Sequence, residues 1–450
     1  MRHIKQWIGA ATAVLVLAQT SWADDENWLT RLPQALTDAD FRPIDPTEAA
    51  LGQLLFYDPI LSGNREVACA TCHHPAFGTS DGLSLGLGDG GIGLGPERQA
   101  NPENMPEQRV PRNSQALWNL GALDYRSLFH DGRVEFDETR PSGMRTPLDE
   151  DMMQGFASML SAQTMFPVLS PDEMAGHYSE NEIAQAVRLG ILTGEGGAWD
   201  RIAQRVAAIP VYRDNFEQVY PEIGAGRALA FTDISNAIAA FIEFEFRSDT
   251  SPFDAYLRGI SELPADAERG MVLFYGAAGC ADCHSGPFQT DHGYYAMGAP
   301  QIGPGKGARF ETHARDEGRF RVTGDLADLY AFRTPALRNV ALTAPYGHAG
   351  ATADLADFLA SHIDGSAIAT YERAQAVLPV LPVDDWRILN ESEETAAILG
   401  ASERNSGVMI TTEDLGALIA FLNSLTDGAA VAGRLGVPEA VPSGLTVPNP

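Results

Sequence analysis

The four cysteines are the residues whose spacing most directly indicates a chemistry. They form two Cys-x-x-Cys-His units, Cys69-Cys72-His73 and Cys280-Cys283-His284. In such a unit each thiol can add to one vinyl group of a porphyrin, and the next imidazole reaches the iron from the same side. Two disulfides are the first alternative for four exported cysteines, and zinc is another, but two complete units use all four. The sequence therefore predicts two covalently bound haem c groups.

Similar segments precede the two units, which indicates an internal repeat. Gly52-Gln53-Leu54-Leu55-Phe56 precedes the first and Gly270-Met271-Val272-Leu273-Phe274 precedes the second. Helical periodicity covers Pro46–Phe56, Glu180–Leu192, Ala198–Tyr220, Asp233–Phe246, Pro264–Tyr275 and Thr412–Leu425. Strand-like alternation is scarce. We expect a mostly α fold of two cytochrome c-like domains, each with one covalently bound haem c.

The chain begins like a secretory signal. A charged start at Arg2, His3 and Lys5 precedes an apolar stretch, and Ser21-Trp22-Ala23 is a small-x-small cleavage site. Ser251-Pro252, Gly259 and Pro264 punctuate a junction between two halves. The predicted parts are a signal peptide at 1–23, an N-terminal domain at 24–262, a C-terminal domain at 263–430 and a flexible tail at 431–450.

The chain is strongly acidic, with 31 Lys plus Arg against 60 Asp plus Glu and a formal charge of -29. This charge disfavours nucleic acid and anionic membranes as partners. It favours a basic partner surface through long-range steering, although it equally serves solubility. After the signal, no stretch reaches the roughly 18 apolar residues of a membrane span. We expect a periplasmic protein without a transmembrane anchor. Residues 78–112, rich in Gly and Pro, are expected to form a long loop beside the first haem.

Beyond the two haem units, the chain from about residue 48 to 426 resembles the bacterial di-haem cytochrome c peroxidases and the related MauG-type enzymes. The landmarks of the resemblance are Leu51-Gly52 to Leu61-Ser62, Arg112-Asn113, Phe129-His130-Asp131-Gly132-Arg133, Gln163, Glu173-Met174, Ser251-Pro252-Phe253-Asp254, Thr334-Pro335-Ala336-Leu337-Arg338-Asn339 and Leu342 to His348. Together they form a specific pattern. The resemblance implies a peroxidatic haem in the N-terminal domain and an electron-transfer haem in the C-terminal domain.

In this family a glutamine and a glutamate ten positions apart line the peroxide pocket. Gln163 and Glu173 match them, with Pro167 in its place between. A carboxylate in a mostly apolar pocket has a raised pKa, which suits a group that takes a proton from peroxide and returns it. Gln163 can orient peroxide or water without titrating. Without the resemblance, Ser170-Pro171-Asp172 favours a turn that leaves Glu173 exposed.

The resemblance also implies a calcium ion between the domains. The family binds it through an Asn side chain and the backbone carbonyls of a Thr and a Pro, which Asn113, Thr343 and Pro345 match. These are the hard oxygen ligands that Ca²⁺ prefers. His348 matches a family histidine that we interpret as a contact of a haem propionate.

The sequence departs from the peroxidases at the first haem. Those enzymes place a displaceable histidine before the Asn of the calcium site, but no histidine lies between Pro75 and Asn113. His74 follows the proximal ligand directly and is expected to point elsewhere. Met105 is a weak substitute. We therefore expect an open, five-coordinate iron that reacts with peroxide without prior reduction of the other haem.

Two further departures concern the second haem and the path between the haems. His362 occupies the position of the distal Met of the peroxidases or Tyr of MauG, seventeen residues after Pro345. A surface histidine at a helix end is the alternative, and the reserve ligands are Met297, His292 and Tyr371. His130 replaces the inter-haem Trp of the family, and imidazole is harder to oxidise than indole. Trp118 is a substitute, unless it is an ordinary core residue.

Three functions are compatible with these features. The first is a peroxidase that reduces hydrogen peroxide with electrons from a small cytochrome or cupredoxin. The second is a MauG-like enzyme that oxidises residues of a partner protein. The third is a non-enzymatic di-haem electron carrier, which the Gln163/Glu173 pair and the missing distal histidine disfavour. We predict a peroxide-dependent oxidoreductase. A homodimer is compatible with the sequence.

Overall fold

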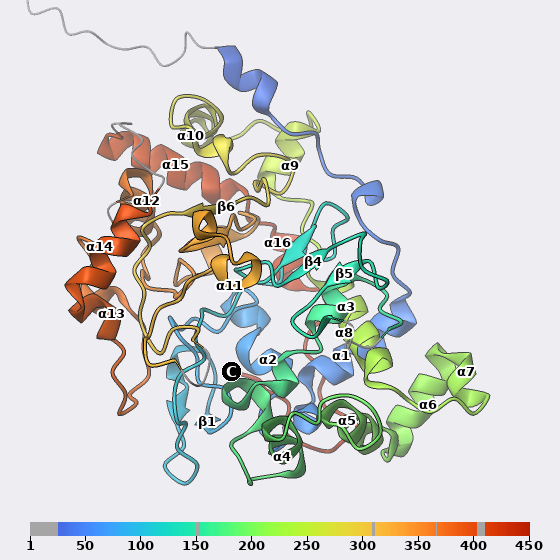
Figure 1. Cartoon of the computed structure of the whole chain (residues 1–450). Helices are drawn as coiled ribbons and strands as arrows, with labels where there is room; N and C mark the ends of the chain where they lie inside the picture. Colours follow the sequence, from blue (N-terminus) through green and yellow to red (C-terminus); the bar gives the residue numbers. More distant parts are fainter. Residues whose placement is uncertain (1–25, 150–153, 308–310, 366, 403–409) are drawn as a thin grey trace, which may run out of the picture.

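The computed structural model describes residues 26–149, 154–307, 311–365, 367–402 and 410–450 of a helix-rich chain with little strand (Figure 1). The predicted signal peptide lies outside the described residues. The helices are α1 Pro46–Tyr57, α2 Cys69–Cys72, α3 Met159–Gln163, α4 Glu182–Arg188, α5 Ala198–Ala207, α6 Pro210–Val219, α7 Pro221–Gly224, α8 Phe231–Glu245, α9 Pro252–Leu257, α10 Ala265–Tyr275, α11 Phe320–Thr323, α12 Leu355–Asp364, α13 Arg387–Asn390, α14 Ser392–Gly400, α15 Thr412–Ser424 and α16 Gly428–Ala432.

The strands are short and pair only with near neighbours or across one long connection. They are β1 Gly91–Ile92, β2 Gln99–Ala100, β3 Ser127–Leu128, β4 Val134–Phe136, β5 Met144–Arg145, β6 Tyr294–Ala296 and β7 Ala331–Arg333. They form three small antiparallel sheets, β1-β2, β3-β4-β5 and β6-β7. The predicted helix-rich fold is confirmed.

Most predicted helices form close to their expected bounds, but two differ. The helix expected over Glu180–Leu192 is the shorter α4, Glu182–Arg188. The stretch Ala198–Tyr220, expected as one helix, is the two helices α5 and α6. Pro210 begins α6, because proline lacks an N–H and interrupts a helix but fits its first turn. At α15 a side-chain cap forms: the Thr411 hydroxyl accepts from the Asp414 N–H (3.1 Å) and donates to the Asp414 carboxylate.

The internal repeat appears as two helix pairs that pack in the same way. A Cβ atom at Gly52 of α1 would lie 1.8 Å from the Ala237 carbonyl oxygen of α8. A Cβ atom at Gly270 of α10 would lie 1.9 Å from the Ala417 carbonyl oxygen of α15. In each pair the added Cβ atom would also lie 2.9 Å from the Cβ of a phenylalanine four residues after that alanine. Glycine is therefore needed where each pair of helices crosses.

We expect Gly270→Ala to destabilise the protein by about 1–3 kcal/mol, because the added methyl group must push α10 and α15 apart. Gly416 is the matched control, since it lies in α15 with nothing within 4 Å of an added Cβ. Gly416→Ala should raise stability by up to about 1 kcal/mol through helix propensity. Denaturant unfolding of the haem-containing protein followed by circular dichroism measures both. Equal effects of the two substitutions would contradict this packing.

The buried apolar side chains form two main cores. One surrounds α1, α5 and α8, and the other surrounds α10 and α15. The start of the described chain lies against the second core, where Trp28 and Leu32 pack and Arg31 forms an ion pair with Asp282. Figure 1 shows this N-terminal segment beside α10. The beginning of the predicted N-terminal domain therefore contacts the C-terminal half.

The C-terminal segment differs from the predicted flexible tail at 431–450. The Glu245 carboxylate accepts hydrogen bonds from the backbone N–H groups of residues 434–436 at 2.7–3.0 Å. Gln53 of α1 donates to the carbonyl oxygens of residues 435 and 436 at 3.0 and 2.9 Å. Val441 is buried, and Ser443 donates to Asp58 (2.6 Å). The tail is thus fixed against the first core because side chains of that core satisfy its backbone.

Buried ion pairs join the two halves around the predicted site. Arg112 donates to Asp131 (2.7 Å) and, through two nitrogens, to Asp316 of the C-terminal half (2.7 and 2.8 Å). Arg109 binds Asp385 in the same two-pronged way (2.7 and 2.9 Å). Removing one partner of such a pair strands a buried charge, which is strongly destabilising. The two halves are therefore held in one arrangement at this point.

Among the described helices, none is both long and apolar enough to cross a membrane.

Candidate functional site

The first Cys-x-x-Cys-His unit forms a single helical turn at the wall of an apolar cavity. Helix α2, Cys69–Cys72, begins where the Ala68 N–H donates to the Thr71 hydroxyl (3.0 Å). His73 follows, with its Nδ1 3.2 Å from the Thr79 carbonyl oxygen. Because a carbonyl can only accept, Nδ1 carries the proton. The other nitrogen, Nε2, is left as the one that can bind a metal.

The second unit repeats this arrangement. Its cysteines lie at the turn Cys280–Asp282 and the residue after it, and His284 Nδ1 lies 3.0 Å from the Gln289 carbonyl oxygen. His362 of α12 faces His284 across this second cavity, with ring centroids 6.3 Å apart. Both imidazoles line the cavity together with the two thiols. The structure thus brings His362 to the Cys280-Cys283-His284 unit, although 78 positions separate it from His284 in the sequence.

Both cavities fit a covalently attached porphyrin. Each has both thiols and the imidazole of its motif in its lining, among mostly apolar side chains. Burial raises the pKa of Cys69 and of Cys72 to about 12. Two metal–nitrogen bonds of about 2 Å on opposite sides of one ion place two imidazole centroids about 6 Å apart. The separation of His284 and His362 matches this value.

Gln163 and Glu173 line the first cavity together with His73. Gln163 ends α3, and its Oε1 is buried without a hydrogen-bond partner among the described residues. Glu173 lies in a π-helical turn, Pro171–Ala175, where sequence reasoning alone favoured an exposed turn. Gly88 lets the neighbouring loop touch this turn, since a Cβ there would lie 2.4 Å from the Glu173 carbonyl oxygen.

The surroundings of Glu173 raise its pKa. Burial is the main cause, because it disfavours the charged form, and the charge of Asp172 adds to it. Lys306 and Arg133 act in the opposite direction, with Lys306 the stronger. A carboxyl group with a raised pKa is better suited to accept a proton and return it than an exposed glutamate is.

The described residues that line the first cavity include only two histidines, His73 and His130. Met105, the weak substitute for a distal ligand, is 45 % exposed and is not among them. His74 also lies outside the lining: its Nδ1 accepts from the Ala76 N–H (3.1 Å). The loop 78–112 carries the hairpin β1-β2 and a 3-10 helix, Gly95–Glu97, and the rest of it is irregular, as expected.

The reserve ligands of the second haem lie in less suitable places, with one exception. Met297 lines the second cavity. His292 is 3.2 Å from Asp124, and the Tyr371 hydroxyl donates to the Ala351 carbonyl oxygen (2.7 Å). Neither His292 nor Tyr371 is in the described lining. His362 remains the residue that faces His284.

His130 lies in the lining of both cavities, whereas Trp118 lines only the second. Burial and the charges of Arg112 and His348 hold the pKa of His130 well below its usual range, so its ring is neutral. His348 stacks on Phe332 with centroids 3.8 Å apart, and its Nε2 is buried without a partner in the described structure. Burial lowers the pKa of His348 to about 4.

The three residues matched to calcium, Asn113, Thr343 and Pro345, lie in the lining of one cavity. The Asn113 side-chain nitrogen donates to the carbonyl oxygen of Leu83 (2.8 Å). Its side-chain oxygen therefore points away from that contact. Among the described residues, no cluster of three or more His, Cys, Asp or Glu could hold a metal. A calcium ion at this place would rely on amide, carbonyl and water oxygens.

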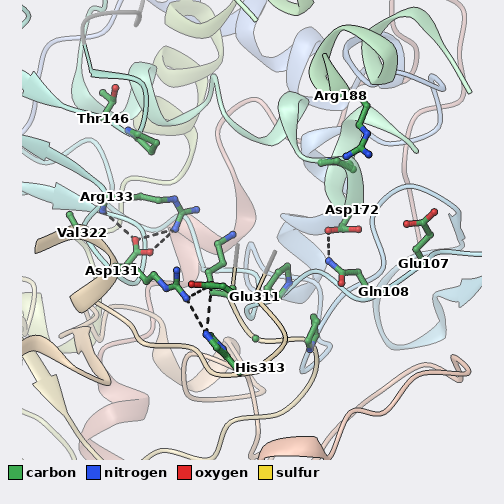
Figure 2. Close-up of a pocket in the computed structure, with 18 of the residues that line it drawn as sticks. Glu107, Gln108, Asp131, Arg133, Thr146, Asp172, Arg188, Glu311, His313 and Val322 are labelled. Atoms are coloured by element: carbon green, nitrogen blue, oxygen red, sulfur yellow. Dashed lines mark hydrogen bonds and ion pairs between the residues drawn. The ribbon is translucent and has the colours of Figure 1, made fainter. Parts of the chain in front are cut away.

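A third cavity, which is polar and has a volume of about 1410 Å³, adjoins the first haem cavity. We call it the vestibule. Figure 2 shows Asp131 and Arg133 on one side of it and Gln108 and Asp172 on the other. Pro111, Arg133 and Lys306 line both the vestibule and the first haem cavity. Sequence reasoning missed Lys306, although one signal was present, since lysine is very rare in this chain.

Comparison with known proteins identifies the family of the chain. Residues 46–262 match the model of a family described as di-haem cytochrome c peroxidase. The methylamine utilization protein MauG of Methylorubrum extorquens is 30% identical over 359 residues, covering 79% of this chain and 80% of that protein. The cytochrome c551 peroxidase of Pseudomonas aeruginosa is 29% identical over 330 residues, covering 73% and 75%.

Solved structures show the same fold. A MauG-like protein associated with microbial copper homeostasis superposes with a TM-score of 0.59 at 26% identity, covering 90% of this chain and 95% of that one. The diheme peroxidase BthA from Burkholderia thailandensis has a TM-score of 0.54 at 22% identity, covering 93% and 94%. At that identity the second likeness concerns the fold alone.

Proposed function

This chain belongs to the di-haem cytochrome c peroxidase family and is a haem-dependent oxidoreductase, and on that premise we propose that it activates hydrogen peroxide in its first cavity. The observation that carries the proposal is the meeting of Gln163, Glu173 and the Cys69-Cys72-His73 unit in that cavity. A haem c attached there supplies the iron at which the O–O bond is reduced. Two electrons and two protons convert one peroxide into two waters.

The side chains of this chain take the following roles in the proposal. Glu173 accepts a proton from the bound peroxide and returns it to the leaving oxygen, which becomes water. Gln163 orients the peroxide through its unpaired Oε1. With haem c at both sites, His73 and His284 would hold the irons through Nε2, because Nδ1 of each is turned to a carbonyl oxygen. His362 completes the second site.

We further propose the two-domain organisation, with residues 24–262 around the peroxidatic haem and 263–430 around the electron-transfer haem. The equivalent packing of Gly52 and Gly270 supports it. Export to the periplasm rests on the signal-like sequence at 1–23. Calcium bound by Asn113, Thr343 and Pro345 is supported by their shared cavity.

The electron donor in this proposal is a small c-type cytochrome or cupredoxin. A relative is named for cytochrome c551, and the acidic chain favours a basic partner surface. Electrons would enter at the haem bound by His284 and His362 and pass the segment that separates the cavities. His130 lines both cavities and is the candidate inter-haem residue, with Trp118 beside the second.

The spectrum of the fully ferric protein tests the proposal. We expect a high-spin component from an open first site, together with a low-spin component from the second. Stoichiometric peroxide should then change the spectrum within seconds, without prior reduction. A ferric spectrum that is entirely low-spin at room temperature, with no peroxide reaction, would refute peroxide activation and favour the electron carrier.

A MauG-like enzyme that oxidises a partner protein is the second candidate. It is favoured by the lining of the first cavity, whose described part has no displaceable histidine apart from His130, and by the likeness to MauG. Steady-state turnover with reduced cytochrome distinguishes the two. Rapid turnover supports the peroxidase, while negligible turnover with a long-lived oxidised state supports the second candidate.

A further inference from the structure

Lysine is almost absent from this chain. Only Lys5 and Lys306 occur, and Lys5 lies in the predicted signal peptide. Arginine supplies the other basic residues, 31 minus 2 or 29 in all. Arginine is always charged and prefers two-pronged carboxylate partners, whereas the ammonium of lysine is a compact charge that titrates readily when buried. Lys306 is therefore the only position beyond the predicted signal peptide that carries an ammonium side chain.

Lys306 lies where the vestibule meets the first haem cavity, and it lines both. It is held by its backbone, whose N–H donates to the Arg315 carbonyl oxygen (3.2 Å). Glu173 lines the haem cavity as well. A cation and a carboxyl group thus share one cavity that holds the proposed peroxide site.

Several carboxyl groups line the cavities that Lys306 borders, among them Glu173 and Asp81 in the haem cavity and Asp131 in the vestibule. Glu173 attracts Lys306 most strongly, ahead of Asp131. Asp131 already accepts hydrogen bonds from Arg112 (2.7 Å) and Arg133 (3.0 Å). Lys306 forms no ion pair with any residue in the described ranges. Lys306 and Glu173 therefore interact at a distance, through a cavity of low polarity in which charges are felt strongly.

We propose that Lys306 is a positioning residue that holds Glu173 in its carboxylate form before peroxide binds. The inference rests on the proposed function, because Glu173 is the proton acceptor there. A protonated Glu173 could not take the proton of the peroxide. The lysine charge keeps it ionised without occupying its oxygens, as a direct salt bridge would.

The electrostatics of both groups agree with this role. Burial raises the pKa of Glu173; Lys306 and Arg133 lower it, and Asp172 raises it further. Burial lowers the pKa of Lys306, with Arg133 and Arg112 adding to this, while Glu173 is the first group that raises it. The attraction is mutual, so removing either charge must shift the pKa of the other group.

Lys306→Met and Lys306→Arg test the proposal through the pH dependence of the peroxide reaction. Without the cation the pKa of Glu173 rises, so the acid limb of the rate profile should move to higher pH by about one unit in Lys306→Met. Lys306→Arg keeps the charge and should keep the limb close to that of the unmodified protein. An unchanged limb in a folded Lys306→Met protein would overturn the proposal.

A second measurement needs no peroxide. After removal of the signal peptide, ¹⁵N-lysine labelling should give one side-chain signal, whose pH titration reports Lys306 directly. Glu173→Gln should lower that pKa, whereas Asp172→Asn, which removes a neighbouring carboxylate, should change it little. No shift in Glu173→Gln would overturn the inference even if peroxide is consumed. A clear shift in a protein that ignores peroxide would leave the inference standing and refute the proposed function.

Discussion

Replacing Glu173 with Gln is expected to slow the peroxide reaction by about 100- to 10,000-fold, the usual contribution of a positioned proton acceptor. The amide has nearly the same shape but cannot take a proton. Stopped-flow mixing of the ferric protein with peroxide measures the effect. Because burial raises the pKa of Glu173, the reaction of the unmodified protein should fall as pH decreases through a midpoint above about 4.3, the ordinary value for glutamate.

Asp172→Asn is the control for this prediction. It removes a carboxylate from the adjacent position, where Gln108 donates to it (2.7 Å) on the wall of the vestibule. Its rate should stay within a few-fold of the unmodified protein. If Glu173→Gln keeps the full rate, or if both variants lose it equally, Glu173 is not the proton acceptor.

Replacing His362 with Ala is expected to convert the second haem from low-spin to high-spin, because one of two strong-field imidazole ligands is lost. The 6.3 Å separation from His284 is the observation behind this expectation. The space left by the imidazole lies inside the cavity, so added imidazole should restore the low-spin spectrum. Electronic absorption and electron paramagnetic resonance of the ferric protein report the change.

Met297→Ala is the matched control, because Met297 lines the same cavity and is the alternative ligand there. It should leave the low-spin signal in place. If Met297→Ala abolishes that signal and His362→Ala does not, the ligand is the methionine. The potential then separates the two assignments as well, since a Met ligand raises the potential of a haem relative to His.

Much of the fold follows from local sequence patterns. Helices α1, α8, α10 and α15 lie where their apolar periodicity predicts them. The two Cys-x-x-Cys-His units can also be recognised locally, because the short spacing of two thiols and an imidazole is enough to indicate haem attachment. Pro210 is a local signal for the end of one helix and the start of the next, but the apolar periodicity continues across it and favoured a single helix.

What could not be predicted depends on contacts between distant segments. The local pattern Ser170-Pro171-Asp172 favours an exposed turn, whereas Glu173 lies in a π-helical turn that the Gly88 loop touches, and only the family resemblance placed it in the pocket. The position of Lys306 between the vestibule and the first haem cavity depends on segments that are distant in the sequence. The tail looked unstructured because its own composition is small and Pro-containing, while its binding partners, Gln53 and Glu245, lie elsewhere.

The attachment of the tail to the first core has a consequence for how the protein is made. Residues 434–436, close to the end of the chain, satisfy Glu245 at the end of α8 and Gln53 in α1. These partners are far apart in the sequence: residue 434 lies 189 positions after Glu245, and residue 435 lies 382 positions after Gln53. The first core therefore cannot reach its final packing until residues 434–436 are available to it.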